Sequence, residues 1–107
     1  MSDNIEDKFD PIRKGLLEFA VLTVIASKKV YAADILSILS TTEFQTQEGT
    51  LYPLLSRMRR EGTVEYEWME SDVGPPRKYY RLTEKGKGQL EAIRNYWQKL
   101  SKILKQK

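Results

Sequence analysis

The side chains best suited to contacting a large ligand lie in one stretch, residues 46–62. Apolar residues recur there at helical spacing, so we expect a helix with one buried face that ends at Gly62. The buried positions are Leu51, Leu54, Leu55 and Met58, and the opposite face carries Gly49, Pro53, Ser56 and Arg60, flanked by Tyr52, Arg57 and Arg59. Small residues permit close approach and arginines bind phosphates. The pattern therefore fits either a nucleic-acid surface or the solvated back of a structural helix.

Catalytic chemistry is hard to build from this composition. The 107 residues include no cysteine and no histidine, which removes thiolate chemistry and the commonest metal ligand and general base. The chain carries no HExxH motif, no Gly-x-Ser-x-Gly motif and no phosphate-cradling glycine-rich loop. We therefore expect no enzymatic activity, no metal and no cofactor.

The first residues predict the location of the protein. Residues 1–11 are polar and acidic and lack the apolar segment of a signal peptide. The longest apolar run, residues 19–26, is interrupted by Thr23 and is too short to span a bilayer. We expect a cytoplasmic protein that does not bind membranes.

Charge is distributed unevenly along the chain, although the net charge is only +3. Every charged residue in the segment 63–73 is acidic, namely Glu65, Glu67, Glu70 and Asp72. The segment 74–88 carries Arg77, Lys78, Arg81, Lys85 and Lys87 against Glu84. Such patterning indicates an oriented electrostatic contact, although by itself a local run of charge is often only a solvated face.

Periodicity predicts two helices before the helix of residues 46–62. Residues 12–27 carry a broad apolar face at helical spacing, and residues 31–39 form a shorter segment with Tyr31, Ile35, Ile38 and Leu39 on one side. Thr46 is the expected N-cap of the following helix, with Glu48 in its first turn. Pro53 lies beyond that first turn, so we expect a local distortion of this helix.

After Gly62 the apolar period changes to two, which predicts a β-hairpin. Val64, Tyr66 and Trp68 alternate with more polar residues, and Asp72-Val-Gly-Pro-Pro76 is a turn signal. The returning strand, residues 78–82, would place Arg77 and Lys78 at the hairpin tip. Arg81 is expected to lie across from the acidic first strand, and Thr83 to cap the last helix.

The last helix, residues 84–105, carries an apolar seam at alternating three- and four-residue steps. The seam consists of Leu90, Ile93, Trp97, Leu100 and Leu104. It either packs on the domain's own core or pairs with a second copy. We expect a homodimer, because the preceding elements already supply a small core and because Tyr96 and Ile103 widen the apolar stripe.

This order of elements predicts a mainly α fold with a small β-hairpin (α+β), in the arrangement of a winged helix-turn-helix. Residues 1–11 form a polar N-terminal arm, residues 12–83 the winged helix, and residues 84–107 a C-terminal dimerisation helix. In such a unit the later helix of the helix-turn-helix enters the DNA major groove. The hairpin then reaches the neighbouring backbone.

Three motifs occur together along the chain: Gly49-Thr-Leu-Tyr-Pro-Leu-Leu55, Arg60-Glu-Gly62 and Gly74-Pro-Pro-Arg-Lys-Tyr-Tyr-Arg-Leu-Thr-Glu-Lys-Gly86. In this combination the chain resembles the compact branch of the PadR family of bacterial transcriptional regulators. The resemblance covers nearly the whole chain and implies a homodimeric repressor on a roughly palindromic operator. One departure is Lys29-Val-Tyr-Ala-Ala33, where the family commonly has a His-Gly-Tyr-type turn. This departure affects the expected angle of the second helix rather than DNA binding.

Eight residues are predicted to contact double-stranded DNA. Gln47 and Thr50 are placed at base edges, since glutamine can pair bidentately with adenine. Tyr52 and Ser56 are predicted to donate hydrogen bonds to phosphates, with packing at the helix flank as the alternative for Tyr52. The charged phosphate contacts are expected from Arg57, Arg60, Arg77 and Lys78.

A small-molecule effector is the remaining prediction. Trp97 lies on the seam with Tyr96 beside it, and two copies of Trp97 across a dimer axis would line a flat slot for a planar aromatic compound. The resemblance implies that some relatives sense phenolic or planar molecules. The alternative is that Trp97 only fills the seam.

A winged-helix module that binds a partner protein is the competing function, because a fold alone does not determine function. A protein-docking face would more often expose apolar or aromatic anchors than the four predicted cations.

Overall fold

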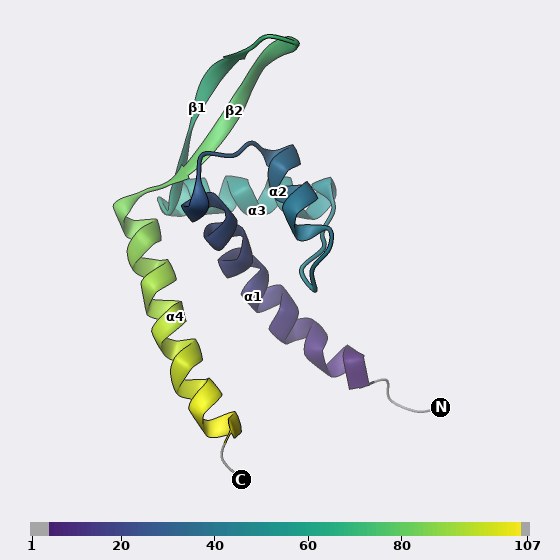
Figure 1. The fold of residues 1–107 in the computed structure, drawn as a ribbon, viewed down its shortest axis with the longest axis vertical. Helices are drawn as coiled ribbons and strands as arrows, with labels where there is room; N and C mark the ends of the chain where they lie inside the picture. Colours follow the sequence, from purple (N-terminus) through teal and green to yellow (C-terminus); the bar gives the residue numbers. More distant parts are fainter. Residues whose placement is uncertain (1–4, 106–107) are drawn as a thin grey trace.

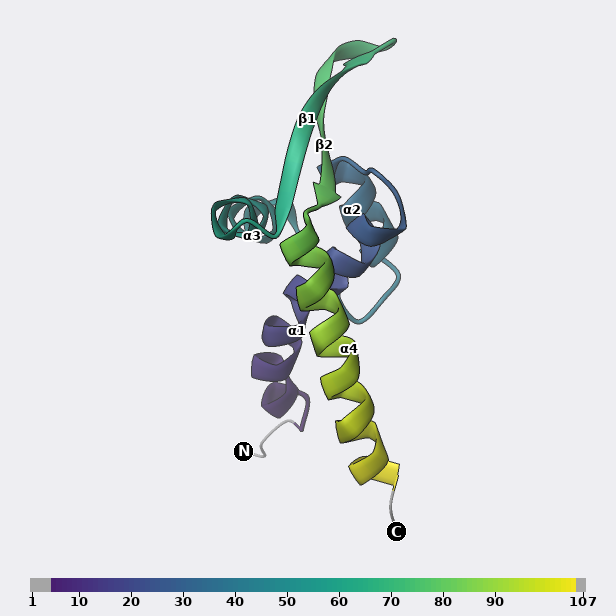
Figure 2. The same cartoon turned by 90° about the vertical axis from the view of Figure 1, so that its left-hand side faces the viewer.

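A computed structural model describes residues 5–105, which form four helices and one antiparallel hairpin in the predicted order (Figure 1). The elements are α1 (Ile5–Ser27), α2 (Ala32–Leu39), α3 (Glu48–Glu61), β1 (Val64–Ser71), β2 (Gly74–Leu82) and α4 (Glu84–Lys105). Helices α1 and α4 run side by side away from the body, and the hairpin projects from its other end (Figures 1 and 2). This arrangement confirms the predicted winged helix-turn-helix with an added C-terminal helix.

The core lies where α1, α2, α3 and the base of the hairpin meet. Its fully buried large side chains include Leu22, Ile35, Leu51, Leu55 and Met58. Burying one such side chain contributes about 1.5–3 kcal/mol, so the apolar faces account for the helix-on-helix packing. The segment between α1 and α2 joins the sheet as well, because Val30 and Tyr80 exchange backbone hydrogen bonds of 3.4 and 2.7 Å.

Helix α1 begins at Ile5, so the predicted start near residue 12 is wrong. The polar arm predicted for residues 1–11 is helical from Ile5 onward, and residues 1–4 lie outside the described part of the chain. Polar residues are compatible with an exposed helical turn, and Asp10 pairs with Arg13 one turn later. The helix continues through Pro11. Within residues 5–105 no helix has the combination of length and apolar character that a membrane crossing requires.

The short helix α2 has a narrower buried face than its pattern predicts. Ile35 and Leu39 are buried one turn apart, whereas Ile38 is 44% exposed. The helix spans only eight residues, so a side chain away from the Ile35–Leu39 line lies beyond the cover of its neighbours.

Helix α3 starts with Gln47 as N-cap, one residue after the predicted Thr46. The amides of Thr50 and Leu51 both donate to the Gln47 carbonyl, at 3.0 and 2.9 Å. The helix continues through Pro53, and the predicted local bend at this residue stays a prediction. It ends at Gly62, whose φ of 83° is the left-handed conformation that glycine adopts most easily.

The hairpin turns at Asp72 and Val73, and the three residues Gly74, Pro75 and Pro76 belong to β2. The two prolines lie opposite Glu70 alone, because the register is irregular between the pairs Met69–Arg77 and Ser71–Gly74. A bulge tolerates residues without an amide hydrogen. The prediction that Arg77 and Lys78 occupy the tip is therefore wrong: they lie along the strand, opposite Met69 and Trp68.

A close contact at the end of the hairpin fixes the direction of α4. Thr83 caps the helix as predicted, since its Oγ1 accepts a hydrogen bond from the amide of Gly86 at 3.0 Å. The Thr83 hydroxyl in turn donates to the carbonyl of Gly62 at 2.6 Å. A Cβ on Gly86 would lie 2.0 Å from the carbonyl oxygen of Thr63, so only glycine permits this approach. The first turn of α4 is thereby joined to the end of α3.

Candidate nucleic-acid interface

A groove of about 470 Å³ lies between the exposed face of α3 and the hairpin. The side chains that matter for its chemistry are Tyr31, Tyr52, Ser56, Trp68, Arg77 and Lys78. A smaller hollow of about 250 Å³ shares Ser56 and Lys78 with it and adds Arg59 and Arg60 from α3. We call the two together the α3–hairpin groove. It brings together five of the predicted DNA contacts: Tyr52, Ser56, Arg60, Arg77 and Lys78.

Within the described part of the chain, the cations of this groove have no acidic partner. Among the side chains that the structure describes, ion pairs engage Arg13, Lys29, Arg57, Arg81 and Lys87. The four groove cations, Arg59, Arg60, Arg77 and Lys78, take part in none of them. A cleft lined by charge of one sign attracts the opposite charge, so the groove is suited to a polyanion.

Two acidic residues of β1, Glu65 and Glu67, form ion pairs with cations outside the groove. Glu65 pairs with Arg81 across the strands at 3.5 Å, which confirms the predicted cross-strand role of Arg81. Glu67 pairs with Lys29, and this contact lowers the pKa of the Glu67 carboxyl below its usual 4.5. These two carboxylates alternate with Tyr66 and Trp68 along β1, so they lie on the face of the hairpin opposite Lys78, whereas the strand register places Arg77 on the same face as Glu67.

Aromatic rings hold three of the four groove cations. The Arg77 guanidinium lies 4.6 Å from the centroid of the Tyr31 ring, and Arg59 lies at the same distance from Tyr66. The Lys78 ammonium lies 4.6 Å from the Tyr66 ring and 5.4 Å from that of Trp68. Such contacts occupy ring faces and leave N–H groups available to an anion.

The groove lining includes residues that were not among the predicted DNA contacts, and those with cationic or at least partly exposed aromatic side chains are Tyr31, Arg59, Tyr66 and Trp68. The alternation along β1 was a usable signal, because it places Tyr66 and Trp68 on the same face as the cross-strand neighbour Lys78. Tyr31 carried no such signal, since its place depends on the bridge between Val30 and Tyr80. Tyr80 itself is buried between the helices and the hairpin, and this burial raises the pKa of its phenol.

Arg57 lies apart from the other predicted contacts. Its guanidinium donates to Glu18 of α1 at 3.0 Å and to Glu61 one turn later at 3.2 Å. The hydrogen bond to Glu18 is the main reason why the pKa of Arg57 is raised. This arginine therefore links α3 to α1 rather than lining the α3–hairpin groove.

The two predicted base-reading residues lie at the start of α3. Gln47 and Thr50 are both exposed, and neither lines the α3–hairpin groove. The Gln47 side chain makes no capping hydrogen bond, so its amide is not used by the helix that it precedes.

Known proteins identify the architecture. A model of the PadR-like family of transcriptional regulators matches residues 21–92, from the second half of α1 into α4. The chain belongs to this family. The predicted family is therefore confirmed, and so is the prediction that the protein is not an enzyme, because these are regulators of transcription.

Solved PadR-like structures share both the fold and the length of the chain. A PadR-like transcription factor from Bacteroides fragilis is 39% identical, with a TM-score of 0.78, over 95% of this chain and 96% of that one. A PadR-like regulator from Bacillus cereus is 35% identical, with a TM-score of 0.81, over 92% and 100%. An uncharacterized protein from Lysinibacillus sphaericus is 30% identical over 96 residues, which are 87% of this chain and 88% of that protein.

The apolar seam of this PadR-like protein divides into a covered part and an uncovered part. Leu90 is 4% exposed and belongs to the core of its own chain, and Ile93 packs against that core. Trp97 is 46% exposed and Leu104 is 70% exposed. Leu90 thus supports the base of α4 within one protomer, whereas the C-terminal half of the seam is available for a second surface.

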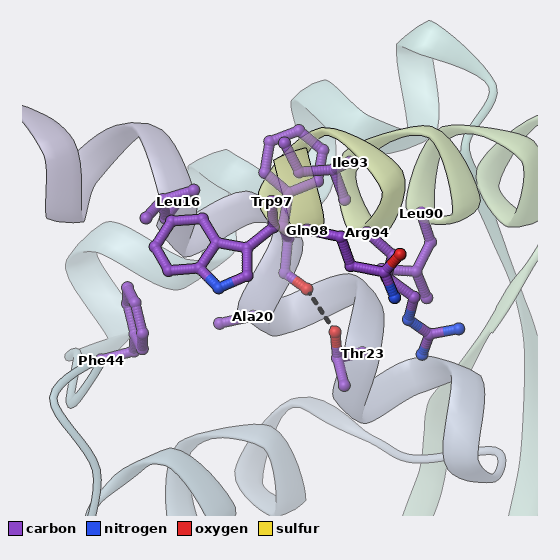
Figure 3. Close-up of a pocket in the computed structure, with 10 residues that line it drawn as sticks. Leu16, Ala20, Thr23, Phe44, Leu90, Ile93, Arg94, Trp97 and Gln98 are labelled. Carbon is purple, nitrogen blue, oxygen red and sulfur yellow. Dashed lines mark hydrogen bonds between the residues drawn. The ribbon is translucent and has the colours of Figure 1, made fainter. Parts of the chain in front are cut away.

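A second, apolar groove of about 400 Å³ lies between α1 and α4 of the PadR-like chain (Figure 3). Its apolar lining includes Leu16, Phe19, Ala20, Phe44, Ile93 and Trp97, and its polar lining consists of Thr23, Arg94 and Gln98. In Figure 3 the Trp97 indole lies between Leu16 and Phe44. Tyr96, the other predicted effector contact, does not line this groove and is 64% exposed.

Proposed function

We propose that this PadR-like regulator binds a roughly palindromic operator as a homodimer and represses transcription until a planar aromatic or phenolic compound releases it. Membership of the family implies DNA binding, and the α3–hairpin groove is the observation that supports this surface as the place where DNA binds. Among the side chains that the structure describes, the four groove cations have no acidic partner, whereas Lys29, Arg57 and Arg81 nearby form ion pairs. The site of action of such a regulator is the bacterial cytoplasm, where the DNA lies.

Within this proposal the contacts divide into those that position the protein and those that read sequence. Gln47 and Thr50 read base edges from the start of α3. Tyr52 and Ser56 donate hydrogen bonds to phosphates, and Arg60, Arg77 and Lys78, joined by Arg59, supply the charged phosphate contacts. Arg57 drops out of this set, because Glu18 and Glu61 already hold its guanidinium.

The salt dependence of DNA binding tests the phosphate contacts. Four cations in each protomer correspond to a slope of log K against log salt of about −7 for a dimer on duplex DNA. Arg60→Gln removes one contact in each protomer, so the slope should become less steep by about 2. Anisotropy of a labelled random duplex at several salt concentrations measures both values.

Arg57→Gln is the matched control, because it removes the same charge from the same helix outside the groove. We expect its salt slope to remain that of the unmodified protein. Equal slopes for Arg60→Gln and the unmodified protein would remove Arg60 from the interface. Absence of any duplex binding at low salt would reject DNA binding and favour the alternative function, a module that binds a partner protein.

The dimer rests on the uncovered apolar surface of α4. Trp97, Leu100 and Leu104 follow one another along one side of the helix, and Tyr96 and Ile103 extend the exposed apolar area. Burial of apolar area favours association by about 25 cal/mol per Å² before the cost of ordering, so a second copy of the same seam is a suitable partner. A twofold dimer would place half-sites about one helical turn apart or a multiple of it.

The proposed effector site is built around Trp97, which borders the apolar groove between α1 and α4. A planar aromatic compound would stack on this indole, with Tyr96 at the edge of the site. Titration of candidate compounds against the emission of Trp97 in a Trp68→Phe variant tests this. We expect compounds that release operator DNA to quench Trp97, and release without any change in its emission would reject the site.

A further inference from the structure

The part of the α3–hairpin groove nearest α2 contains a contact between elements far apart in the sequence. Arg77 lies on β2, and the ring beneath its guanidinium belongs to Tyr31, the residue before α2. The distance from the Arg77 Cζ to the ring centroid is 4.6 Å. Both side chains line the groove, and both are partly buried.

The backbone of Tyr31 is anchored independently of its side chain. Its amide donates to Oδ2 of Asp34 at 3.3 Å, and its carbonyl accepts from the amides of Asp34 and Ile35 at 2.9 and 3.2 Å. The preceding residue, Val30, is hydrogen-bonded to Tyr80 of β2. Tyr31 is thus held where the first turn of α2 meets the sheet.

The ring of Tyr31 is held from its side as well. It makes an edge-on contact with Tyr79 of β2, with 5.4 Å between centroids and an interplanar angle of 70°. One ring contact therefore fixes its orientation, while Arg77 stacks over it. A substitution of the ring changes these contacts but leaves the backbone hydrogen bonds of Tyr31 in place.

Stacking suits a guanidinium that must also bind a phosphate. The ring takes the flat face of the guanidinium, and the N–H groups point outward in its plane, where a phosphate can accept them. A long arginine side chain otherwise loses rotamer freedom when it binds, and holding it beforehand reduces that cost.

We propose that Tyr31 is a positioning residue, which holds Arg77 in the orientation that contacts the DNA backbone. This inference rests on the proposed DNA binding. Lys78, the next residue, provides the internal comparison. Its ammonium is held by Tyr66 and Trp68 of the hairpin, so its position does not depend on Tyr31.

A double-mutant cycle in DNA affinity tests the proposal. We expect Tyr31→Leu to weaken binding of a labelled duplex by roughly threefold to tenfold. In the presence of Arg77→Gln the same change should have little further effect, because the group that it positions is gone. In the double variant with Lys78→Gln, the fold losses of DNA affinity caused by Tyr31→Leu and by Lys78→Gln should multiply, because the two positions act independently.

The conservative variant separates positioning from direct contact. Tyr31→Phe keeps the ring and its stacking but lacks the hydroxyl, so its affinity should stay within about twofold of the unmodified protein. A loss as large as that of Tyr31→Leu would show that the hydroxyl contacts DNA itself and would overturn the proposal. Coupling of Tyr31 to both Arg77 and Lys78 would also overturn it, since that result indicates displacement of the whole hairpin.

A measurement without substitution covers the case in which Tyr31→Leu does not fold. The Arg77 δ protons should be shifted upfield in the proton NMR spectrum of the unmodified protein by the ring current of Tyr31. Unshifted signals would overturn the proposal whether or not DNA binds. If the unmodified protein binds duplex but Arg77→Gln binds equally well, the role of Tyr31 fails while the proposed function stands.

Discussion

Replacement of Gly86 by alanine should destabilise the fold through one identifiable contact. The new Cβ would lie 2.0 Å from the Thr63 carbonyl oxygen, whereas real Cβ atoms essentially never approach closer than 3.0 Å. The start of α4 must therefore move by about 1 Å relative to the end of α3. That carbonyl also accepts the Thr83 amide at 3.1 Å, so the clash falls on a hydrogen-bonded backbone group with little freedom to give way.

The magnitude follows from the contacts at this junction. Overpacking of a tight site costs about 1–3 kcal/mol. Displacement of the helix start also weakens the cap between Thr83 Oγ1 and the Gly86 amide, which is worth about 1 kcal/mol. Alanine recovers up to about 1 kcal/mol through its higher helix propensity. We expect a net loss of about 1–3 kcal/mol, which lowers the Tm of a domain of this size by roughly 4 °C or more.

Gly88→Ala is the matched control, two residues further along the same helix. A Cβ at Gly88 would meet nothing within 4 Å, so this change should raise the Tm by a few degrees through helix propensity alone. Thermal denaturation followed by circular dichroism compares both variants at one protein concentration, since the proposed dimerisation would make the Tm depend on concentration. A Gly86→Ala variant that is as stable as Gly88→Ala would refute the account of this junction.

Two further predictions concern the dimer and the outer face of the hairpin. Leu104→Glu changes an exposed position of the seam and should lower the mass measured by analytical ultracentrifugation to that of a monomer. Lys102→Glu, on the opposite side of α4, should leave the mass of the dimer unchanged. If Leu104→Glu remains a dimer, the interface does not lie on this seam. Because Lys29 lowers the pKa of Glu67 below 4.5, this pair stabilises the folded state above that pH and loses its contribution as the pH falls through the lowered pKa. Denaturation midpoints between pH 7 and pH 3 should therefore depend less on pH in Glu67→Gln than in Glu70→Gln, and equal pH dependence would show that the pair is not formed in solution.

Much of the fold could be predicted from local patterns. The period of the apolar residues located α2, α3 and α4, and Gly62 and Thr83 ended and began helices as their residue types indicate. The turn was placed wrongly because Gly-Pro-Pro is a strong turn signal by itself. Here the bulge opposite Glu70 admits both prolines into β2 and leaves Asp72 and Val73 to turn the chain.

The groove was predictable only in part, since its composition depends on contacts between distant segments. The exposed face of α3 followed from helical spacing, which located Tyr52, Ser56 and Arg60. The pairing of Arg57 with Glu18 joins residues 39 positions apart, and the only local clue is Glu61, which follows Arg57 by one helical turn. The stacking of Arg77 on Tyr31 likewise depends on the bridge that brings Val30 beside β2.

The two tryptophans of the chain allow a direct test of where DNA binds. Trp68 lines the α3–hairpin groove, whereas Trp97 lies on α4 beside the apolar groove. Duplex DNA should quench the emission of a Trp97→Phe variant, which reports Trp68, and leave that of a Trp68→Phe variant unchanged. DNA that binds both variants by anisotropy without altering the emission of Trp68 would contradict the placement of DNA in the α3–hairpin groove.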